Sequence, residues 1–307
     1  MDRLKFTTAA VGCGGIAACL YLSATFGTTG ALLLVYMTQL PLFIAGLWLG
    51  TSAAASAGLT GTALLLLTSD QLSAAVFIGL NAVPVVLLVR VALLARRQPD
   101  GAILWYPPGL LTAWLTGMTL AGLLGAVLLF GGPGGLQAAV RGIIAEVLDR
   151  MLREPPIDHG DIVAAIATIT PGVVAASWMV TAIANAVLAQ GVLARFGVNW
   201  RPSPDLVGLS LPLWLPAALA LAAAATLIPG APRFIGVNVM LALTVPFCLA
   251  GLAVLHAAAR RMAQPAVALV CFYTVAMLFG WPFLMVAVLG LLESWLGLRR
   301  RLAPPIH

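Results

Sequence analysis

The fold is decided by stretches such as Phe234 to Ala258, which reads FIGVNVMLALTVPFCLAGLAVLHAA. This stretch contains no Asp, Glu, Lys or Arg, and it is longer than the roughly 20 apolar residues with which a helix crosses a bilayer. Similar apolar runs recur along the chain, and we place them at 7–25, 30–50, 52–68, 72–95, 109–131, 163–195, 207–228, 234–258 and 266–297. The pattern predicts an all-α, polytopic transmembrane helical bundle.

The composition supports the same fold class. The chain has 307 residues, of which 62% are hydrophobic and 8% charged, and its mean hydropathy is +1.06. Soluble proteins carry about 25% charged residues, so the composition excludes a soluble enzyme, a nucleic-acid binder and a disordered chain. We therefore expect one integral membrane domain over 1–307, with about 8 to 10 membrane segments in contact with the lipid bilayer.

Basic residues predict the orientation, because cytoplasmic loops carry an excess of Lys and Arg. If the N-terminus is cytoplasmic, the inner loops hold the larger set. The inner set is Arg3, Lys5, Arg96, Arg97, Arg195, Arg201, Arg260 and Arg261, and the outer set is Arg141, Arg150, Arg153 and Arg233. The C-terminal Arg299, Arg300 and Arg301 join the inner set if the run 266–297 folds as a hairpin at Gly280-Trp281-Pro282. We thus expect a bacterial inner (plasma) membrane protein with both termini cytoplasmic; the alternative is nine single spans.

The segment 132–161 is expected to be an extracytoplasmic loop with structure of its own. Apolar residues recur at helical spacing over 136–153, while the opposite face carries Gln137, Arg141 and Glu146. This pattern is typical of an amphipathic helix that lies in the membrane interface. Two interpretations stay open, a plain surface helix and a lid over a site that opens outward.

The informative polar residues are amides inside the apolar runs: Gln39, Asn81, Asn185 and Asn238. A buried amide without a hydrogen-bond partner is costly in hydrocarbon, so such side chains turn toward other helices. One interpretation is that they tie helices together. The other is that they line an outward-facing neutral pocket that binds an uncharged or zwitterionic small molecule.

Helix breakers and two charged residues also lie within the runs. Proline removes a backbone donor and bends a helix, and the carbonyls that it frees often surround cavities. These prolines are Pro41, Pro84, Pro171, Pro212, Pro216, Pro246 and Pro282. The intramembrane charges are Arg90 and Glu293, for which we expect snorkelling or a local ion pair, with a relay through Glu293 as the alternative.

Several apolar motifs resemble a known family. They are Leu40-Pro41-Leu42-Phe43 leading to Gly50, Trp105-Tyr106-Pro107, Pro246-Phe247 through Gly251-Leu252-Ala253, and Leu289 to Trp295 before the arginines. On these stretches the chain resembles the YybS-like family of uncharacterised bacterial membrane proteins, which is distantly similar to the S-components of energy-coupling-factor vitamin transporters. The resemblance implies that the small-residue stripe Ala10, Gly14 and Ala18 docks on a coupling subunit, with Gly in place of the usual middle Ala.

These observations lead to two hypotheses for the function. The first is a small-molecule binding or transport component, which would work with a membrane coupling subunit and its ATPase. The second is a non-catalytic scaffold whose partners are cell-envelope assembly proteins. No catalytic motif is present, so we expect no enzyme activity, no cofactor and no metal; Asp158-His159-Gly160-Asp161 could ligate a cation, but capping of the next helix by Asp161 is the simpler interpretation. The basic residues form no single stripe, so nucleic acid is not an expected partner.

Overall fold

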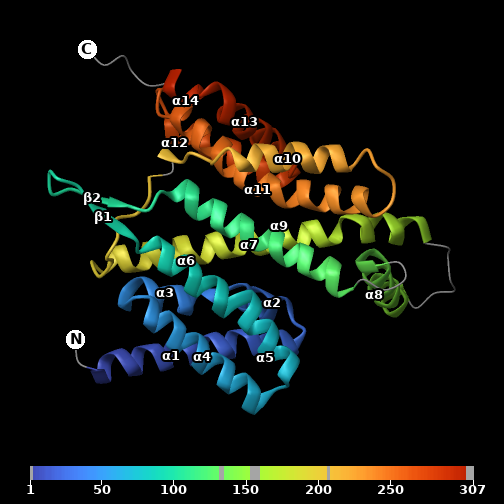
Figure 1. Cartoon of the computed structure of the whole chain (residues 1–307), viewed down its shortest axis with the longest axis horizontal. Helices are drawn as coiled ribbons and strands as arrows, with labels where there is room; N and C mark the ends of the chain where they lie inside the picture. Colours follow the sequence, from blue (N-terminus) through green and yellow to red (C-terminus); the bar gives the residue numbers. More distant parts are fainter. Residues whose placement is uncertain (1–2, 131–134, 153–159, 206–207, 302–307) are drawn as a thin grey trace. The chain divides into compact units, whose positions relative to one another are not determined.

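The protein is helical almost throughout in the computed structural model, which describes residues 3–130, 135–152, 160–205 and 208–301 (Figure 1). Its elements are α1 (Arg3–Leu22), η1 (Ser23–Phe26), α2 (Thr29–Tyr36), α3 (Gln39–Leu49), α4 (Thr51–Thr68), α5 (Gln71–Phe77), the π-helical η2 (Ile78–Ala82), α6 (Val83–Ala92), β1 (Ala95–Arg97), β2 (Ile103–Trp105), α7 (Pro108–Leu129), α8 (Gly135–Leu152), α9 (Gly160–Arg195), α10 (Trp214–Ala225), α11 (Ala231–Ala259), α12 (Pro265–Phe279), α13 (Pro282–Leu296) and α14 (Leu298–Arg301). The predicted all-α bundle is confirmed.

Within the described residues, seven helices are long and apolar enough to cross a membrane, and a bent pair brings the number to eight. The seven are Phe6–Phe26, Thr29–Leu49, Thr51–Thr68, Gln71–Ala92, Pro108–Leu129, Gly160–Arg195 and Ala231–Ala259. The bent pair is α12 with α13, between which the helix axis bends by 118°. The chain therefore bends sharply at Gly280-Trp281-Pro282, where Gly280 takes a positive φ of 72°. The membrane hairpin with a cytoplasmic C-terminus stays a prediction.

One expected segment is shorter than the sequence suggested. The run 207–228 is helical only over α10, Trp214–Ala225. Twelve residues reach only about 18 Å at 1.5 Å per residue, which is too short to span the hydrocarbon core. Pro212 precedes the helix and Pro216 lies in its first turn, where proline is tolerated, so the helix begins late.

The described helices form two compact units. Unit 1 comprises Met1–Leu111 and Val180–Asp205, and unit 2 comprises Thr112–Met179 and Leu206–His307. Helix α9 contributes residues to both units, since the division falls between Met179 and Val180. The single membrane domain expected over 1–307 stays a prediction.

Unit 1 is built on close contact between small residues of α1 and α4. A side chain at Gly14 would overlap the backbone oxygen of Ala57, and one at Gly61 would overlap the ring of Phe77. The Phe77 ring is fully buried and lies edge-on to Tyr21, with 5.6 Å between the ring centroids. Small residues let helix backbones approach closely, and this packing holds helices together where the surrounding lipid is as apolar as the side chains.

Unit 2 is centred on α11. Its core joins Leu243 and Phe247 of α11 to Leu215 of α10, Ala287 of α13 and Ala113 of α7. Helices α11 and α13 are in close contact, because a side chain at Gly290 would overlap the backbone oxygen of Phe247, and one at Gly251 that of Val286. These glycines allow the second arm of the bent pair to pack along α11.

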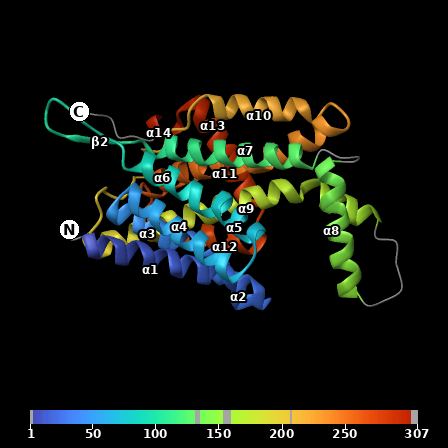
Figure 2. The ribbon, with the colours of Figure 1, turned by 60° about the horizontal axis from the view of Figure 1, so that its bottom comes forward.

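Helix α8 is the predicted amphipathic helix, and it runs across the direction of α7 (Figure 2). Its first two turns are held to α9 by two side chains: Gln137 Nε2 donates to Thr168 Oγ1 at 3.0 Å, and Arg141 Nη2 donates to the Gly160 oxygen at 3.3 Å. Ile143 and Val147 are exposed and lie one turn apart. A helix placed across a span, with an exposed apolar face, suits the membrane interface that was predicted for it.

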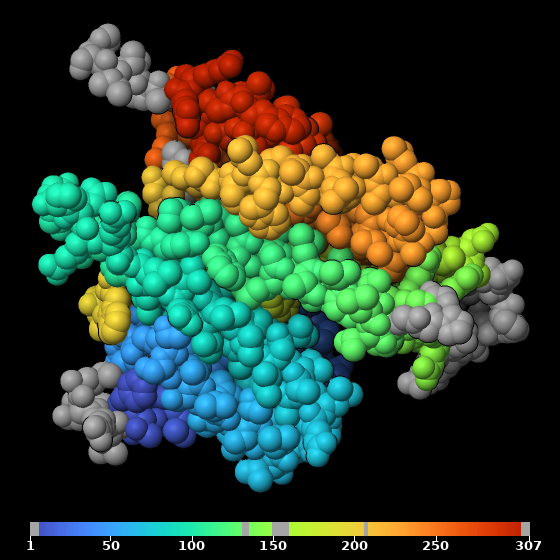
Figure 3. Space-filling model, in the orientation of Figure 1, coloured from blue at the N-terminus to red at the C-terminus, as the bar shows by residue number. Residues whose placement is uncertain are grey.

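A short antiparallel hairpin leaves the helices of unit 1 after α6. Strands β1 and β2 pair Ala95 with Trp105 and Arg97 with Ile103. Figure 3 shows the hairpin as a protruding lobe. The hairpin was not predicted, since its strands are only three residues long.

Candidate functional site

The polar residues selected from the sequence find their partners where prolines interrupt helices. The backbone N–H of residue i in a helix normally bonds the carbonyl of residue i−4. Proline has no such N–H, so Pro84 makes no helical hydrogen bond to the oxygen of Leu80. Gln39 Nε2 donates to that oxygen at 2.9 Å. This carbonyl lies inside the π-helical turn η2, in the middle of the span Gln71–Ala92.

A second interruption lies in the span Thr29–Leu49. Pro41 cannot donate to the oxygen of Met37, and its ring crowds that carbonyl. The helix breaks at Met37 and Thr38, so α2 ends at Tyr36 and α3 begins at Gln39. The N–H of Leu40 bonds the oxygen of Met37 instead of that of Tyr36. The Tyr36 oxygen is thereby available to a side chain from another helix.

Asn185 of α9 supplies that side chain. Its Nδ2 donates to the Tyr36 oxygen at 2.7 Å and to the Thr181 oxygen, one turn earlier in α9, at 2.8 Å. Both side chains thus lie at the break between α2 and α3. Gln39 is the first residue of α3, and Asn185 bonds the oxygen of Tyr36, the last residue of α2. We call these two side chains, with the backbone oxygens of Leu80, Tyr36 and Thr181, the amide site of unit 1.

Each amide in this site is satisfied at its nitrogen and unsatisfied at its oxygen. Gln39 is 2% exposed and Asn185 3% exposed, and neither Gln39 Oε1 nor Asn185 Oδ1 has a hydrogen-bond partner. Exchanging oxygen and nitrogen would not cure this, because the oxygen would then face a backbone oxygen that cannot donate. A buried acceptor without a donor costs about 1 to 3 kcal/mol. The site is therefore incomplete as it stands.

The remaining predicted amides do not share this arrangement. Asn81 lies in η2 next to Leu80 and is half-buried. Asn238 lies in unit 2 and is fully partnered: its Oδ1 accepts from the N–H of Gly172, and its Nδ2 donates to the oxygens of Thr168 at 2.9 Å and Phe234 at 2.7 Å. The interpretation of Asn238 as a tie between helices therefore holds. The predicted pocket lined by all four amides stays a prediction.

The small-residue stripe on α1 is used inside the chain. Ala10 and Ala18 are 1% and 2% exposed, and Gly14 lies against Ala57 and Thr60 of α4. This face is therefore covered by α4 and is not open to another protein in this structure. The docking role that the family resemblance implied for the stripe stays a prediction.

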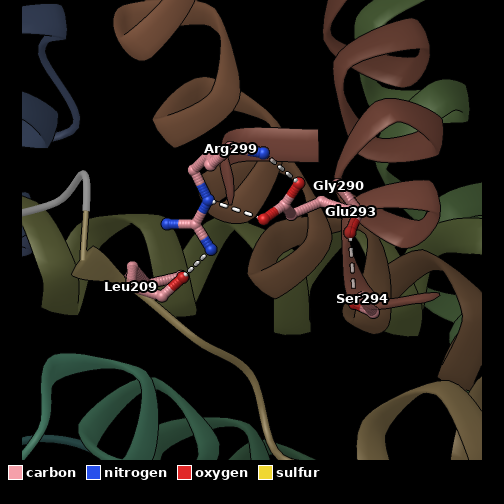
Figure 4. A network of polar contacts seen from close by, with 5 residues as sticks. All are labelled: Leu209, Gly290, Glu293, Ser294 and Arg299. Carbon is pink, nitrogen blue, oxygen red and sulfur yellow. Dashed lines mark hydrogen bonds and ion pairs between the residues drawn. The ribbon is translucent and has the colours of Figure 1, made fainter. Parts of the chain in front are cut away.

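The two intramembrane charges have different surroundings. Arg90 is exposed at the end of α6. Glu293 is 8% exposed, and its Oε1 accepts from Nε of Arg299 at 2.8 Å, which is the local ion pair that the sequence suggested (Figure 4). Arg299 also donates its backbone N–H to Glu293 Oε2 and its Nη2 to the oxygen of Leu209. The carboxylate thus fixes the start of α14 to the end of α13.

Arg201 is a buried charge that the sequence analysis counted only as a loop residue. It is 6% exposed, and its Nη1 and Nη2 donate to the oxygens of Ala92 at 3.0 Å and Tyr106 at 2.8 Å. Its own backbone oxygen accepts from Gln190 and Asn199, each at 2.7 Å. Burial lowers the pKa of the Arg201 guanidinium. Arg201 therefore holds together the end of α6, the end of the β1–β2 hairpin and the loop after α9.

No metal centre is formed by the residues that the structure describes, because they contain no group of three His, Cys, Asp or Glu side chains able to hold an ion. His159, with Asp158, lies outside the described residues. The cysteines Cys13, Cys19, Cys248 and Cys271 are free thiols.

Fold and site together define a multi-pass α-helical membrane protein. Residues 158–294 match the model of a family described as predicted membrane protein (DUF2232). The chain is thus similar to an uncharacterised family of membrane proteins over its C-terminal part. Comparisons with curated proteins and with solved structures gave no match.

Proposed function

We propose that this protein is a small-molecule binding component of the bacterial inner membrane, and that its ligand binds at the amide site of unit 1. The observation that carries the proposal is the pair of buried oxygens, Gln39 Oε1 and Asn185 Oδ1, that lack donors. Native proteins satisfy buried polar atoms with protein, water or ligand. A bound molecule that donates hydrogen bonds would satisfy such an oxygen.

The helix interruptions support the same proposal. Discontinuous helices that meet in the middle of the membrane are the usual construction of solute sites in transporters, because irregular backbone is tolerated only where it lines a site or is buried in protein. Here the break at Met37 and Thr38 and the π-turn Ile78–Ala82 both lie midway along spans. A membrane anchor would need neither interruption.

We extend this proposal on the basis of the resemblance to the YybS-like family and to S-components. The protein would then bind a vitamin-like solute from the outside, place both termini in the cytoplasm and work with a membrane coupling subunit that carries an ATPase. No catalytic role is proposed.

A screen for ligand-induced stabilisation tests the proposal. Purified protein in mild detergent is heated with vitamins and small metabolites, and a ligand that binds only the folded state raises the unfolding temperature. We expect one compound to stabilise the wild type and to lose its effect in Gln39→Leu. The matched control is Asn238→Leu, which removes a buried amide of unit 2 and should leave the response intact. No stabilising compound, or equal responses in both variants, would count against the proposal.

The scaffold hypothesis has one supporting observation. Helix α12 is strongly apolar, and Ala276 is its one buried residue among those described. Its exposed face would suit a membrane partner from the envelope-assembly machinery. Affinity purification in mild detergent separates the two hypotheses: an ATP-hydrolysing partner supports the binding component, whereas stable wall-synthesis partners that are lost on mutating α12 support the scaffold.

A further inference from the structure

We infer that the amide site takes a small monovalent cation, either an alkali-metal ion or the ammonium group of a small solute. This inference rests on the proposed function, since it names the kind of ligand that the same site would hold. It follows from the polarity of the free atoms, the charges around them and the helix end beside them.

The free atoms of the site are acceptors only. The nitrogens of Gln39 and Asn185 are already engaged with backbone oxygens, and the atoms left over are two amide oxygens. Two amide oxygens offer lone pairs and no hydrogen. A phosphate, sulfate or carboxylate would meet only like partial charge here, so the ligand must bring hydrogen-bond donors or positive charge.

The local field also favours a positive ligand. Helix α2 ends at Tyr36, so its last carbonyls point toward the break where both amides attach. The C-terminal end of a helix carries partial negative charge that favours cations. In membrane transporters, unwound backbone and helix C-termini coordinate sodium ions in this way.

The charge of the site favours a monovalent ion over a divalent one. The acidic residues described in unit 1 are Asp70, Asp100 and Asp205, and all three lie in exposed connections outside the spans. Calcium and magnesium sites depend on carboxylates. Neutral oxygens alone suit a single positive charge, as in the carbonyl rings of potassium channels.

The experiment measures the unfolding temperature of the full chain, purified in detergent in choline chloride. Choline is replaced stepwise by sodium, potassium or methylammonium at constant chloride. Binding with the ion at about ten times its dissociation constant should raise the unfolding temperature by about 4 °C. A response to sodium or potassium identifies a metal-ion site, and a response to methylammonium alone identifies a site for an ammonium group. No difference from choline in any of the three salts overturns the inference and leaves a buried water as the occupant.

Variants connect the response to the site. In Gln39→Lys the side-chain ammonium can donate to the Leu80 oxygen and also supply the charge internally, so the ion response should disappear. Asn238→Leu in unit 2 should lower the starting temperature but keep the response. A response that persists in Gln39→Lys would place the ion elsewhere and overturn the assignment. If Gln39→Lys does not fold, Asn185→Asp replaces it: the added negative charge should lower the ion concentration for half-maximal response by at least about tenfold, equivalent to 1.4 kcal/mol.

The two proposals can fail separately. Repeating the solute screen in choline chloride detects ligands in the absence of a metal cation. An uncharged solute that stabilises the wild type but not Gln39→Leu would keep the proposed function and contradict the cation. An ion response without any solute response would keep the cation site and contradict the binding of a solute.

Discussion

The side chain of Asn238 is inserted between Gly172 and its regular helical hydrogen-bond partner in α9. In a regular helix the N–H of Gly172 would bond the oxygen of Thr168. Here that N–H donates to Asn238 Oδ1, while Asn238 Nδ2 donates to the Thr168 oxygen at 2.9 Å. The amide of α11 therefore sits between two partners in α9, next to Pro171, where the helix is already interrupted. Insertion of a side chain into the helical ladder is a known cause of kinks.

Replacing Asn238 with leucine should destabilise unit 2. The change removes three hydrogen bonds and leaves the N–H of Gly172 and the Thr168 oxygen unpaired in an apolar setting. We expect a loss of about 2 to 4 kcal/mol, measured by denaturant unfolding in mixed micelles. Asn81→Leu is the matched control, since Asn81 is half-buried, and it should cost much less. Equal losses of unfolding free energy in the two variants would contradict the insertion of Asn238 into α9.

Glycines at the contact of α11 and α13 should tolerate no side chain. A methyl group at Gly290 would overlap the Phe247 oxygen, and backbone cannot rotate away as a side chain can. Gly290→Ala should therefore destabilise by about 1 to 3 kcal/mol or more, despite the better helix propensity of alanine. In Gly122→Ala of α7, where no atom lies within 4 Å, the same change should be neutral or stabilising. Thermal unfolding of the two variants side by side checks the prediction.

The sequence predicted most of the spans, because apolar length is a local property that each run displays by itself. It also selected both the amides and the prolines that meet in the structure. Their pairing could not be predicted, since Asn185 and Tyr36 are 149 residues apart. One signal was nevertheless present: Pro84 cannot donate to the oxygen of Leu80, so a side-chain donor to that oxygen could be sought in the sequence.

Other features could not be predicted correctly, because they depend on contacts that the sequence does not show. The run 207–228 has the composition of a span, but Pro212 and Pro216 delay the start of its helix to Trp214, and the helix ends at Ala225. Arg201 lies in a loop, where arginine is normally solvated, and only the fold brings the oxygens of Ala92 and Tyr106 to its guanidinium. The family resemblance implied that the stripe on α1 docks on a coupling subunit, but composition does not reveal that α4 of the same chain packs against it.

Arg201 should be important for the stability of unit 1. Removing its side chain removes the charged donors to the oxygens of Ala92 and Tyr106, and hydrogen bonds to charged groups are worth about 1.5 to 3 kcal/mol each. We expect Arg201→Ala to cost about 3 kcal/mol and Arg201→Lys less, because a single ammonium can reach one carbonyl more easily than both. Arg195→Ala, at an exposed arginine nearby in the chain, is the control and should have little effect on denaturant unfolding.

The ion pair of Glu293 and Arg299 should contribute more to the stability of the fold than its single distance suggests. Loss of one member of a buried pair leaves the other charge uncompensated, and Arg299 is only 15% exposed. Glu293→Gln should destabilise by about 2 to 3 kcal/mol and loosen α14, as seen by faster hydrogen exchange at Arg299. The exposed Arg300 provides the comparison, and Arg300→Ala should change neither quantity. A similar effect of both substitutions would show that general charge, and not the pair, stabilises this end of the chain.

Asp70 should make the start of α5 sensitive to acid. Its Oδ1 accepts from the N–H of Ser73 at 2.9 Å and its Oδ2 from the Ser73 hydroxyl at 2.7 Å, and these bonds hold the pKa of Asp70 below its usual value of 3.8. A depressed pKa means that the cap stabilises the folded helix above the usual value and is lost as the pH falls through the lower, folded pKa. Hydrogen exchange at Ser73 should therefore show falling protection in that acid range. Asp70→Asn keeps a capping oxygen but does not titrate, so its protection should not change with pH there; a parallel loss in Asp70→Asn would assign the acid response to another group.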